Sequence, residues 1–194
     1  DWLDSKMLAC MPMHHPKGLR VIDDLGPAVP LKRAVRHRDS ILVRRQACTG
    51  RVDALLELMG PHWLGIFGAL SYNKTAVAVL EKYANPHALR KLGRSRLIKL
   101  MIRSSRGHIR DAKADELLEA VDLTLQLWAD SGLDFDELAA DIEIEIAQIK
   151  LFDDQIKALD DRIEDLYEQA DPHGIIVSVP GVLTTLAAGI LGRT

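Results

Sequence analysis

Two aspartates at the start of the chain have the spacing of a paired-carboxylate site. Asp1 and Asp4 are three residues apart, so on a helix both carboxylates project from one face. Two such groups repel each other unless a cation neutralises them, and together they can bind Mg²⁺. The same spacing is common in the first turn of a helix, where acids favour the positive end of the dipole. The pattern alone leaves a metal site and a helix start open.

The sequence lacks the residue patterns of other common catalytic and binding sites. Cys10, His14 and His15 have no further ligand at zinc spacing, and the serines have no His/Asp partners at a recognisable spacing. The chain also lacks a Walker-type phosphate loop and a dinucleotide fingerprint. No apolar run approaches the ~20 residues of a membrane span, and no secretory signal is present. The sequence therefore predicts a cytoplasmic protein with no membrane partner.

The charges are segregated along the chain. Residues 17–51 hold nine Lys/Arg and three acids, for a net charge of +6, and residues 90–113 hold nine Lys/Arg and one acid, for +8. Residues 115–171 hold nineteen acids and three Lys/Arg, for −16. A chain that concentrates cations in this way can neutralise phosphates with its basic parts, although the blocks are also compatible with solvated helix faces.

Helical periodicity dominates the sequence. We expect helices over 31–59, 74–83, 87–92, 94–104, 112–128 and 184–191, with a tight helix contact or a turn over 63–72. The 31–59 segment has an apolar stripe at Leu31, Ala34, Val35, Leu42, Cys48, Val52, Leu55 and Met59. The fold class is therefore mainly α.

The strongest periodic signal lies between residues 135 and 170. Its steps alternate between three and four residues without a break, and only Glu145 interrupts the apolar series, which consists of Phe135, Leu138, Ile142, Ile149, Phe152, Ile156, Leu159, Ile163, Leu166 and Ala170. This period predicts a long coiled coil or helical hairpin. Its partner is either the basic 31–59 helix of the same chain or a second copy, which would make a homo-oligomer.

The chain closes with a Pro-Gly turn before a small-residue helix. Val179-Pro180-Gly181-Val182 precedes the 184–191 helix, a layout that a helix-hairpin-helix uses to bring backbone amides to a phosphate. Leu183 occupies the place of the usual second glycine, so a tight structural turn is an equal interpretation of Gly181.

Several segments together resemble one family. Asp1-Trp2-Leu3-Asp4-Ser5-Lys6-Met7-Leu8-Ala9 resembles the Asp-x-x-Asp-Ala-x-x-Leu-Ala segment of the DEDD transposases of the insertion-sequence-110 family. The 36–43 and 51–56 segments are similar to its Arg-x-Arg-x-x-Leu-Val and Asn-Arg-Leu-x-x-Leu-Leu helix, and 179–188 to its Ile-Pro-Gly-Val-Gly-x-x-Thr-Ala stretch. The chain departs from these patterns at Ser5, Gly50 and Leu183.

The resemblance implies a recombinase that moves a DNA element, guided by a structured RNA, with a RuvC-like (RNase-H-like) acidic site and a separate serine nucleophile. By resemblance, Asp1 and Asp4 are the last two of four catalytic acids and ligands of Mg²⁺. The implied domains are the end of the RuvC-like domain (1–25), a helical and coiled-coil connector (26–171) and the start of a small helical transposase domain (172–194). The chain would then be a piece that is inactive alone and nucleoid-associated.

The implied partners are DNA, a guide RNA and a second copy of the chain. The candidate nucleic-acid-binding residues come from the two basic blocks and the Pro-Gly turn: Arg33, Arg36, Arg38, Arg44, Arg45, Arg51, Arg94, Arg96, Lys99, Arg103, Arg106 and Gly181. Two alternatives stay open. One is a non-enzymatic coiled-coil interaction protein, and the other is a DNA-binding module built on a helix-hairpin-helix.

Overall fold

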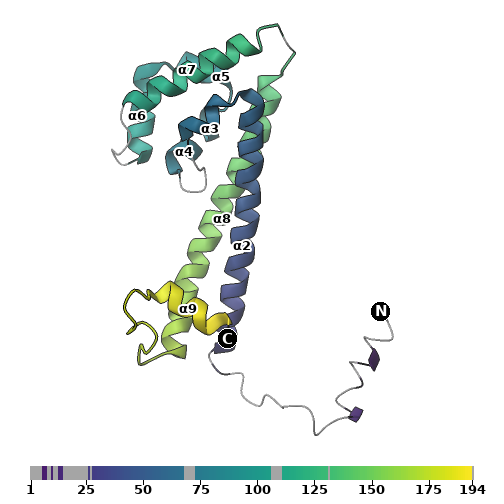
Figure 1. Ribbon diagram of the computed structural model, residues 1–194, viewed down its shortest axis with the longest axis vertical. Helices are drawn as coiled ribbons and strands as arrows, with labels where there is room; N and C mark the ends of the chain where they lie inside the picture. The colour runs from purple at the N-terminus through teal and green to yellow at the C-terminus, as the bar shows by residue number, and fades with distance from the viewer. Residues whose placement is uncertain are drawn as a thin grey trace. The chain divides into compact units, whose positions relative to one another are not determined.

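The computed structural model describes residues 6, 7, 10, 13, 14, 26, 28–67, 73–105, 111–130 and 132–193. These residues are mainly helical, and none of them lies in a strand. Figure 1 shows the labelled helices, which are α2 (Ala28–Met59), α3 (His62–Phe67), α4 (Lys74–Tyr83), α5 (Pro86–Leu92), α6 (Arg94–Ser105), α7 (Asp111–Leu127), α8 (Phe135–Ala170) and α9 (Thr184–Arg193). The expected mainly-α class is confirmed.

Short polar side chains start three of these helices. The Asn73 side chain accepts hydrogen bonds from the backbone amides of Thr75 and Ala76 at 3.1 and 3.0 Å, and so caps α4. Asn85 caps α5, where Pro86 occupies the first turn. Asp134 accepts from the first amides of α8 at 2.9 and 3.2 Å. Each cap satisfies amides that have no partner within the helix.

The chain divides into two compact units, and α2 and α8 each contribute to both. Unit 1 comprises residues 1–35 and 163–194, and unit 2 comprises residues 36–162. This division does not test the domain boundaries expected from the sequence, which fall after residue 25 and after residue 171, and they stay predictions.

The core of unit 1 joins small and large side chains. Ala187 and Ala188 of α9 are fully buried against a cluster that is completed by Leu31, Ala34, Val35, Ile163 and Tyr167. Two alanines let the α9 backbone approach its neighbours closely. The Tyr167 hydroxyl donates to Asp171 at 2.6 Å, and Asp171 accepts from the amides of Ile175 and Ile176, both at 3.0 Å. These bonds hold the chain where it leaves α8.

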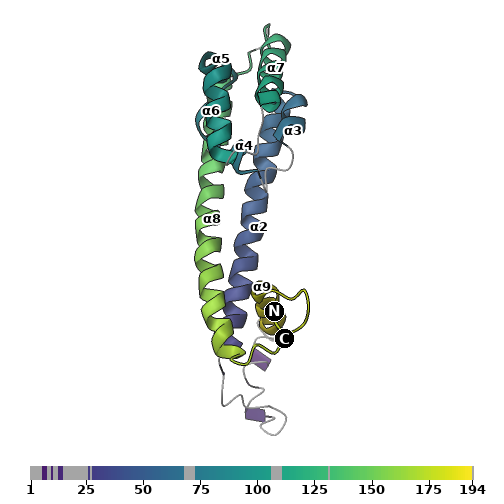
Figure 2. The same cartoon turned by 90° about the vertical axis from the view of Figure 1, so that its left-hand side faces the viewer.

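Unit 2 is built on an antiparallel pair formed by α2 and α8. The two helices lie side by side within this unit in both views (Figures 1 and 2). Buried residues of α2 share one cluster with buried residues of α8, namely Cys48, Val52, Leu56 and Met59 with Leu138, Ala139, Ile142, Ile146 and Ile149. The apolar series of α8 is therefore covered by α2 of the same chain over this region.

Helices α3 to α7 complete that cluster. Trp63 is fully buried, and its indole N–H donates to Thr124 Oγ1 at 2.8 Å, which ties α3 to α7. The Trp128 indole donates to the carbonyl of Met59 at 3.0 Å. The Lys150 ammonium lies 2.6 Å from Glu81 and links α8 to α4. The buried indole of Trp63 and the partly buried indole of Trp128 thus both have polar partners, as burial of such groups requires.

Most of the expected elements are confirmed within a few residues. The 135–170 helix has the expected bounds, whereas the expected start of the first long helix, Leu31, falls three residues inside α2. The 63–72 segment, expected to form a tight helix contact or a turn, contains most of helix α3. The apolar stripe also needs a correction, because the structure buries Ile41 and Leu56, whereas Leu42 and Leu55 are only partly buried.

Candidate nucleic-acid interface

Three arginines of α2 form ion pairs with acids of α8. Arg45 Nε donates to Asp153 at 2.6 Å, Arg51 donates to Glu145 at 2.6 and 2.8 Å, and Arg38 donates to Asp160. The partner numbers fall as the arginine numbers rise, which fixes an antiparallel register. Successive ion pairs are six to eight residues apart on each helix, which is close to one heptad. They therefore stay on one side of the helix pair.

In the Arg45–Asp153 and Arg51–Glu145 ion pairs, one side chain is largely buried and the other is not. The Arg45 side chain is 15% exposed and its partner Asp153 50%, whereas Glu145 is 14% exposed and its partner Arg51 52%. The buried members lie on the seam between the helices, and their partners lie beside it. A guanidinium held in this way is already neutralised by the chain's own carboxylate.

The Glu145 pair shows the electrostatic consequence. The hydrogen bonds from Arg51 lower the pKa of Glu145 below its ordinary value of 4.5. Arg51 also donates to the Cys48 sulfur at 3.2 Å, and burial followed by the Glu145 contact raises the pKa of that thiol. The carboxylate is thus held ionised while the thiol is held neutral, so the cluster contains one cation and one anion.

The second basic block also contains internal pairs. Arg94 donates to Asp115 at 2.6 and 3.0 Å, and this contact lowers the pKa of the Asp115 carboxyl. Arg90 lies 3.3 Å from Asp122. Both pairs link this block to α7, and all four side chains are at least half exposed. They are weak as stabilising contacts, but each places an acid beside its arginine.

A different set of cations is left unpaired. Arg96, Lys99 and Arg103 are exposed on α6, and none forms an ion pair with a described residue. Their spacing of three and four residues places them on one helix face over about 10 Å. On α2, Arg33, Arg36 and Arg44 are exposed and likewise lack an ion-pair partner in the described part of the chain. These side chains are available to an external anion.

The structure therefore divides the candidate residues that the sequence identified into paired and unpaired groups. Arg38, Arg45, Arg51 and Arg94 are paired internally, whereas the α6 trio and the three α2 arginines are free. Gly181 lies in a turn with φ of +86°, ahead of α9, which suits glycine. Asp1, Asp4 and Arg106 lie outside the described residues.

The described residues offer no candidate metal site. No group of three or more His, Cys, Asp or Glu side chains among them is placed to hold a metal ion. Because Asp1 and Asp4 are not described, their fit to Mg²⁺ stays a prediction, and no catalytic step is derived through the ion. In addition, no described helix is long and apolar enough to cross a membrane.

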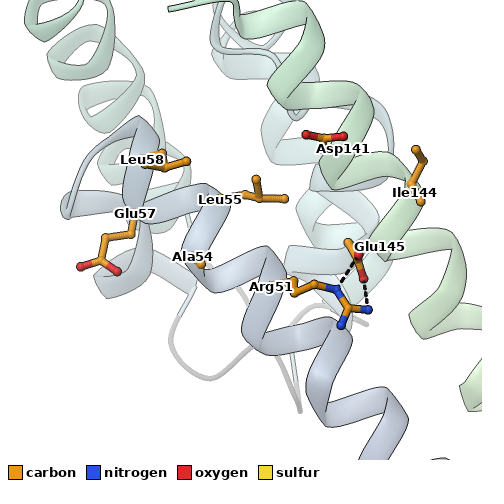
Figure 3. A pocket seen from close by; sticks show the side chains of 8 residues that line it. All are labelled: Arg51, Ala54, Leu55, Glu57, Leu58, Asp141, Ile144 and Glu145. Atoms are coloured by element: carbon orange, nitrogen blue, oxygen red, sulfur yellow. Dashed lines mark hydrogen bonds and ion pairs between the residues drawn. The ribbon is translucent and has the colours of Figure 1, made fainter.

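Sequence reasoning missed one surface feature. An open groove of about 610 Å³ lies between α2 and α8 in unit 2, lined by Arg51, Ala54, Leu55, Glu57, Leu58, Asp141, Ile144 and Glu145 (Figure 3). Leu58 and Ile144 are 54% and 57% exposed. Both are large apolar residues outside the series expected to face the core. Their positions outside that series were the only sign of an exposed apolar surface in the sequence.

Comparison with known proteins identified no relative. No family model, no curated protein and no solved structure matches this chain.

Proposed function

We propose that this chain is the helical, nucleic-acid-binding part of a transposase of the DEDD type. The observation that carries the binding proposal is the face of α6 with Arg96, Lys99 and Arg103, which are exposed and unpaired while neighbouring arginines are neutralised by acids. Three cations on one helix face can contact successive phosphates of a nucleic-acid strand.

The assignment to DNA transposition rests on the ordered series of family-like segments. In this proposal Asp1 and Asp4 belong to the acidic site and contribute ligands to Mg²⁺, while the helical region holds DNA or a structured RNA by its backbone. Phosphate contacts give affinity without sequence specificity, so the proposal concerns positioning of the nucleic acid and not recognition of a target sequence.

The test is a salt titration of binding by the full 194-residue chain. Affinity for a labelled DNA duplex and for an RNA hairpin is measured between about 50 and 200 mM salt, where each phosphate contact contributes about −0.9 to the slope of log K against log salt for duplex DNA. Replacing Arg96, Lys99 and Arg103 with glutamine is expected to reduce the magnitude of that slope by about 2.7.

The matched control replaces Arg90 and Arg94 with glutamine. These arginines lie in the same basic block but face Asp122 and Asp115, so the slope should stay near that of the unmodified chain. If the chain binds neither nucleic acid at low salt, or if both variants change the slope equally, the binding proposal is wrong.

A second candidate is a non-enzymatic helical interaction protein, which the groove between α2 and α8 favours. It predicts that the chain binds a protein helix and shows no salt-dependent affinity for nucleic acid. The helix-hairpin-helix alternative predicts that Gly181→Val abolishes DNA binding, while replacement of Arg36 and Arg44 leaves it unchanged.

A further inference from the structure

The groove of unit 2 has two walls and an apolar floor. Ala54, Leu55 and Leu58 come from α2, and Ile144 comes from α8 (Figure 3). The Arg51–Glu145 ion pair joins the two walls at one end, and the dashed lines in Figure 3 mark its two hydrogen bonds. Large aliphatic side chains that are more than half exposed cost free energy in water, and a partner that covers them recovers it.

The groove lies on a different face of α8 from the one that packs inward. Ile142, Ile146 and Ile149 are fully buried in the shared core, whereas Asp141 and Ile144 point to the groove. Positions 142, 146 and 149 follow helical spacing and define one face of α8, and position 144 lies outside that face. No described residue outside α2 and α8 lines the groove.

The charged residues that line the groove determine which kind of partner it attracts. The lining contains three acids and one arginine, and the arginine is already paired with Glu145. Glu57 and Asp141 both line the groove and are exposed, and neither forms an ion pair with a described residue. The lining thus contains two unneutralised carboxylates together with exposed aliphatic side chains, a surface that repels phosphates and attracts cations.

We propose that this groove is a docking site for a basic amphipathic helix of a protein partner. Leucine-like side chains at i, i+3/i+4 and i+7 of the partner enter between Leu58 and Ile144, as in other helix-in-groove complexes. Lysine or arginine residues beside that stripe reach Glu57 and Asp141. The site shares no residue with the proposed phosphate-binding face of α6, and its net charge has the opposite sign.

The shape also argues against a small-molecule ligand. Small-molecule sites bury about 70–90% of their ligand in a concave pocket. This groove is open and lined by only two helices, so it would leave one side of such a ligand in water.

The test uses a labelled synthetic peptide made only of leucine and lysine, with the leucines at i, i+3/i+4 and i+7. A peptide of identical composition with the leucines distributed around the helix controls for non-specific binding, and a leucine and glutamate peptide controls for charge. Fluorescence anisotropy with the full chain should show saturable, micromolar binding of the first peptide. We expect about tenfold weaker binding or none for the other two.

Neutral substitutions locate the site. Ile144→Gln should weaken binding of the basic peptide about tenfold, and the pair Glu57→Gln with Asp141→Gln should do so while the apolar floor stays intact. The matched control is Val43→Gln, since Val43 is 68% exposed on α2 but does not line the groove. Circular dichroism establishes that each variant retains its helix content.

Three results would overturn the proposal. The first is equal binding of the amphipathic and the redistributed peptide. The second is unchanged affinity of Ile144→Gln for the basic peptide. The third is self-association of the unmodified chain in sedimentation equilibrium that Ile144→Gln abolishes, because it would show that the occupant is a second copy. Loss of nucleic-acid binding by α6 variants has no bearing on this outcome.

Discussion

Arg51 and Glu145 form a doubly hydrogen-bonded ion pair at the one place where the apolar series of α8 is interrupted. Glu145 occupies a seam position and is mostly buried, while Arg51 reaches it from beside the seam. The interruption is therefore filled by an ion pair between α2 and α8, at a position where an apolar residue would pack equally well against many neighbours.

Removal of the Glu145 carboxylate should destabilise the chain modestly. Glu145→Ala deletes both hydrogen bonds from Arg51, but Arg51 is half exposed and can be solvated, so the expected loss is about 1 kcal/mol in the free energy of unfolding. Urea denaturation followed by circular dichroism measures it. Glu143→Ala is the control, since Glu143 is an exposed acid on the same helix. An equal effect of the two substitutions would contradict a special role for Glu145.

Stability should also depend on pH through this carboxylate. Its pKa is lower in the folded chain than the ordinary 4.5, so the folded state favours the ionised form. The contribution is complete above about 4.5, where the carboxylate of the unfolded chain is also ionised, and it is lost as pH falls through the folded-state pKa. The unmodified chain should be more stable than Glu145→Gln at neutral pH, and the difference should be smaller at an acidic pH below the folded-state pKa, where the carboxylate is protonated.

The measurement is the same urea titration at the two pH values. Glu143→Gln provides the reference for general charge effects of α8. A difference between the unmodified chain and Glu145→Gln that is the same at both pH values would show that the carboxylate acts through packing and not through its charge.

Arg44 and Arg45 are adjacent in sequence and should separate binding from stability. Arg45 is paired with Asp153 and mostly buried, whereas Arg44 is exposed and has no ion-pair partner among the described residues. We expect Arg45→Gln to lower the free energy of unfolding and to leave nucleic-acid affinity unchanged. Arg44→Gln should leave stability unchanged and reduce the magnitude of the salt slope of DNA binding by about 0.9.

Both variants are measured by urea denaturation and by the salt titration described for α6. If Arg44→Gln has no effect on the slope while the α6 substitutions do, the phosphate-binding surface is restricted to α6. If Arg45→Gln weakens binding in proportion to Arg44→Gln, the internal ion pair opens when nucleic acid binds, and the division of the arginines is wrong.

The long helices were predictable because their signals are long. The 135–170 series repeats over five heptads and is preceded by Asp134, a strong cap, so both its type and its start follow from local chemistry. The six-residue α3 carries no periodic signal, and its position depends on the tertiary contact of Trp63 with Thr124. The choice between Ile41 and Leu42 was similarly open, since neighbouring residues differ by about 100° around a helix.

The sequence predicted the candidate nucleic-acid interface only through its concentration of basic residues. The basic blocks identify arginines that are able to bind phosphate, but the sequence does not show which acid lies opposite each one. Only the antiparallel register of α2 and α8 places Asp153 beside Arg45 and leaves Arg44 free. The groove depends in the same way on the relative rotation of the two helices, which the period of a single helix does not specify.

Two glycines should respond in opposite directions to alanine. Gly50 lies inside α2 with helical φ, is exposed, and has no atom within 4 Å of the position where a Cβ would be, so Gly50→Ala should stabilise the chain by about 0.5–1 kcal/mol. Gly93 also has open space, but its φ of +76° lies in the left-handed region at the end of α5. Gly93→Ala should therefore destabilise by about 1 kcal/mol through backbone strain. Thermal unfolding of the two variants measures both signs. A destabilising Gly50→Ala would contradict the open space found around that position.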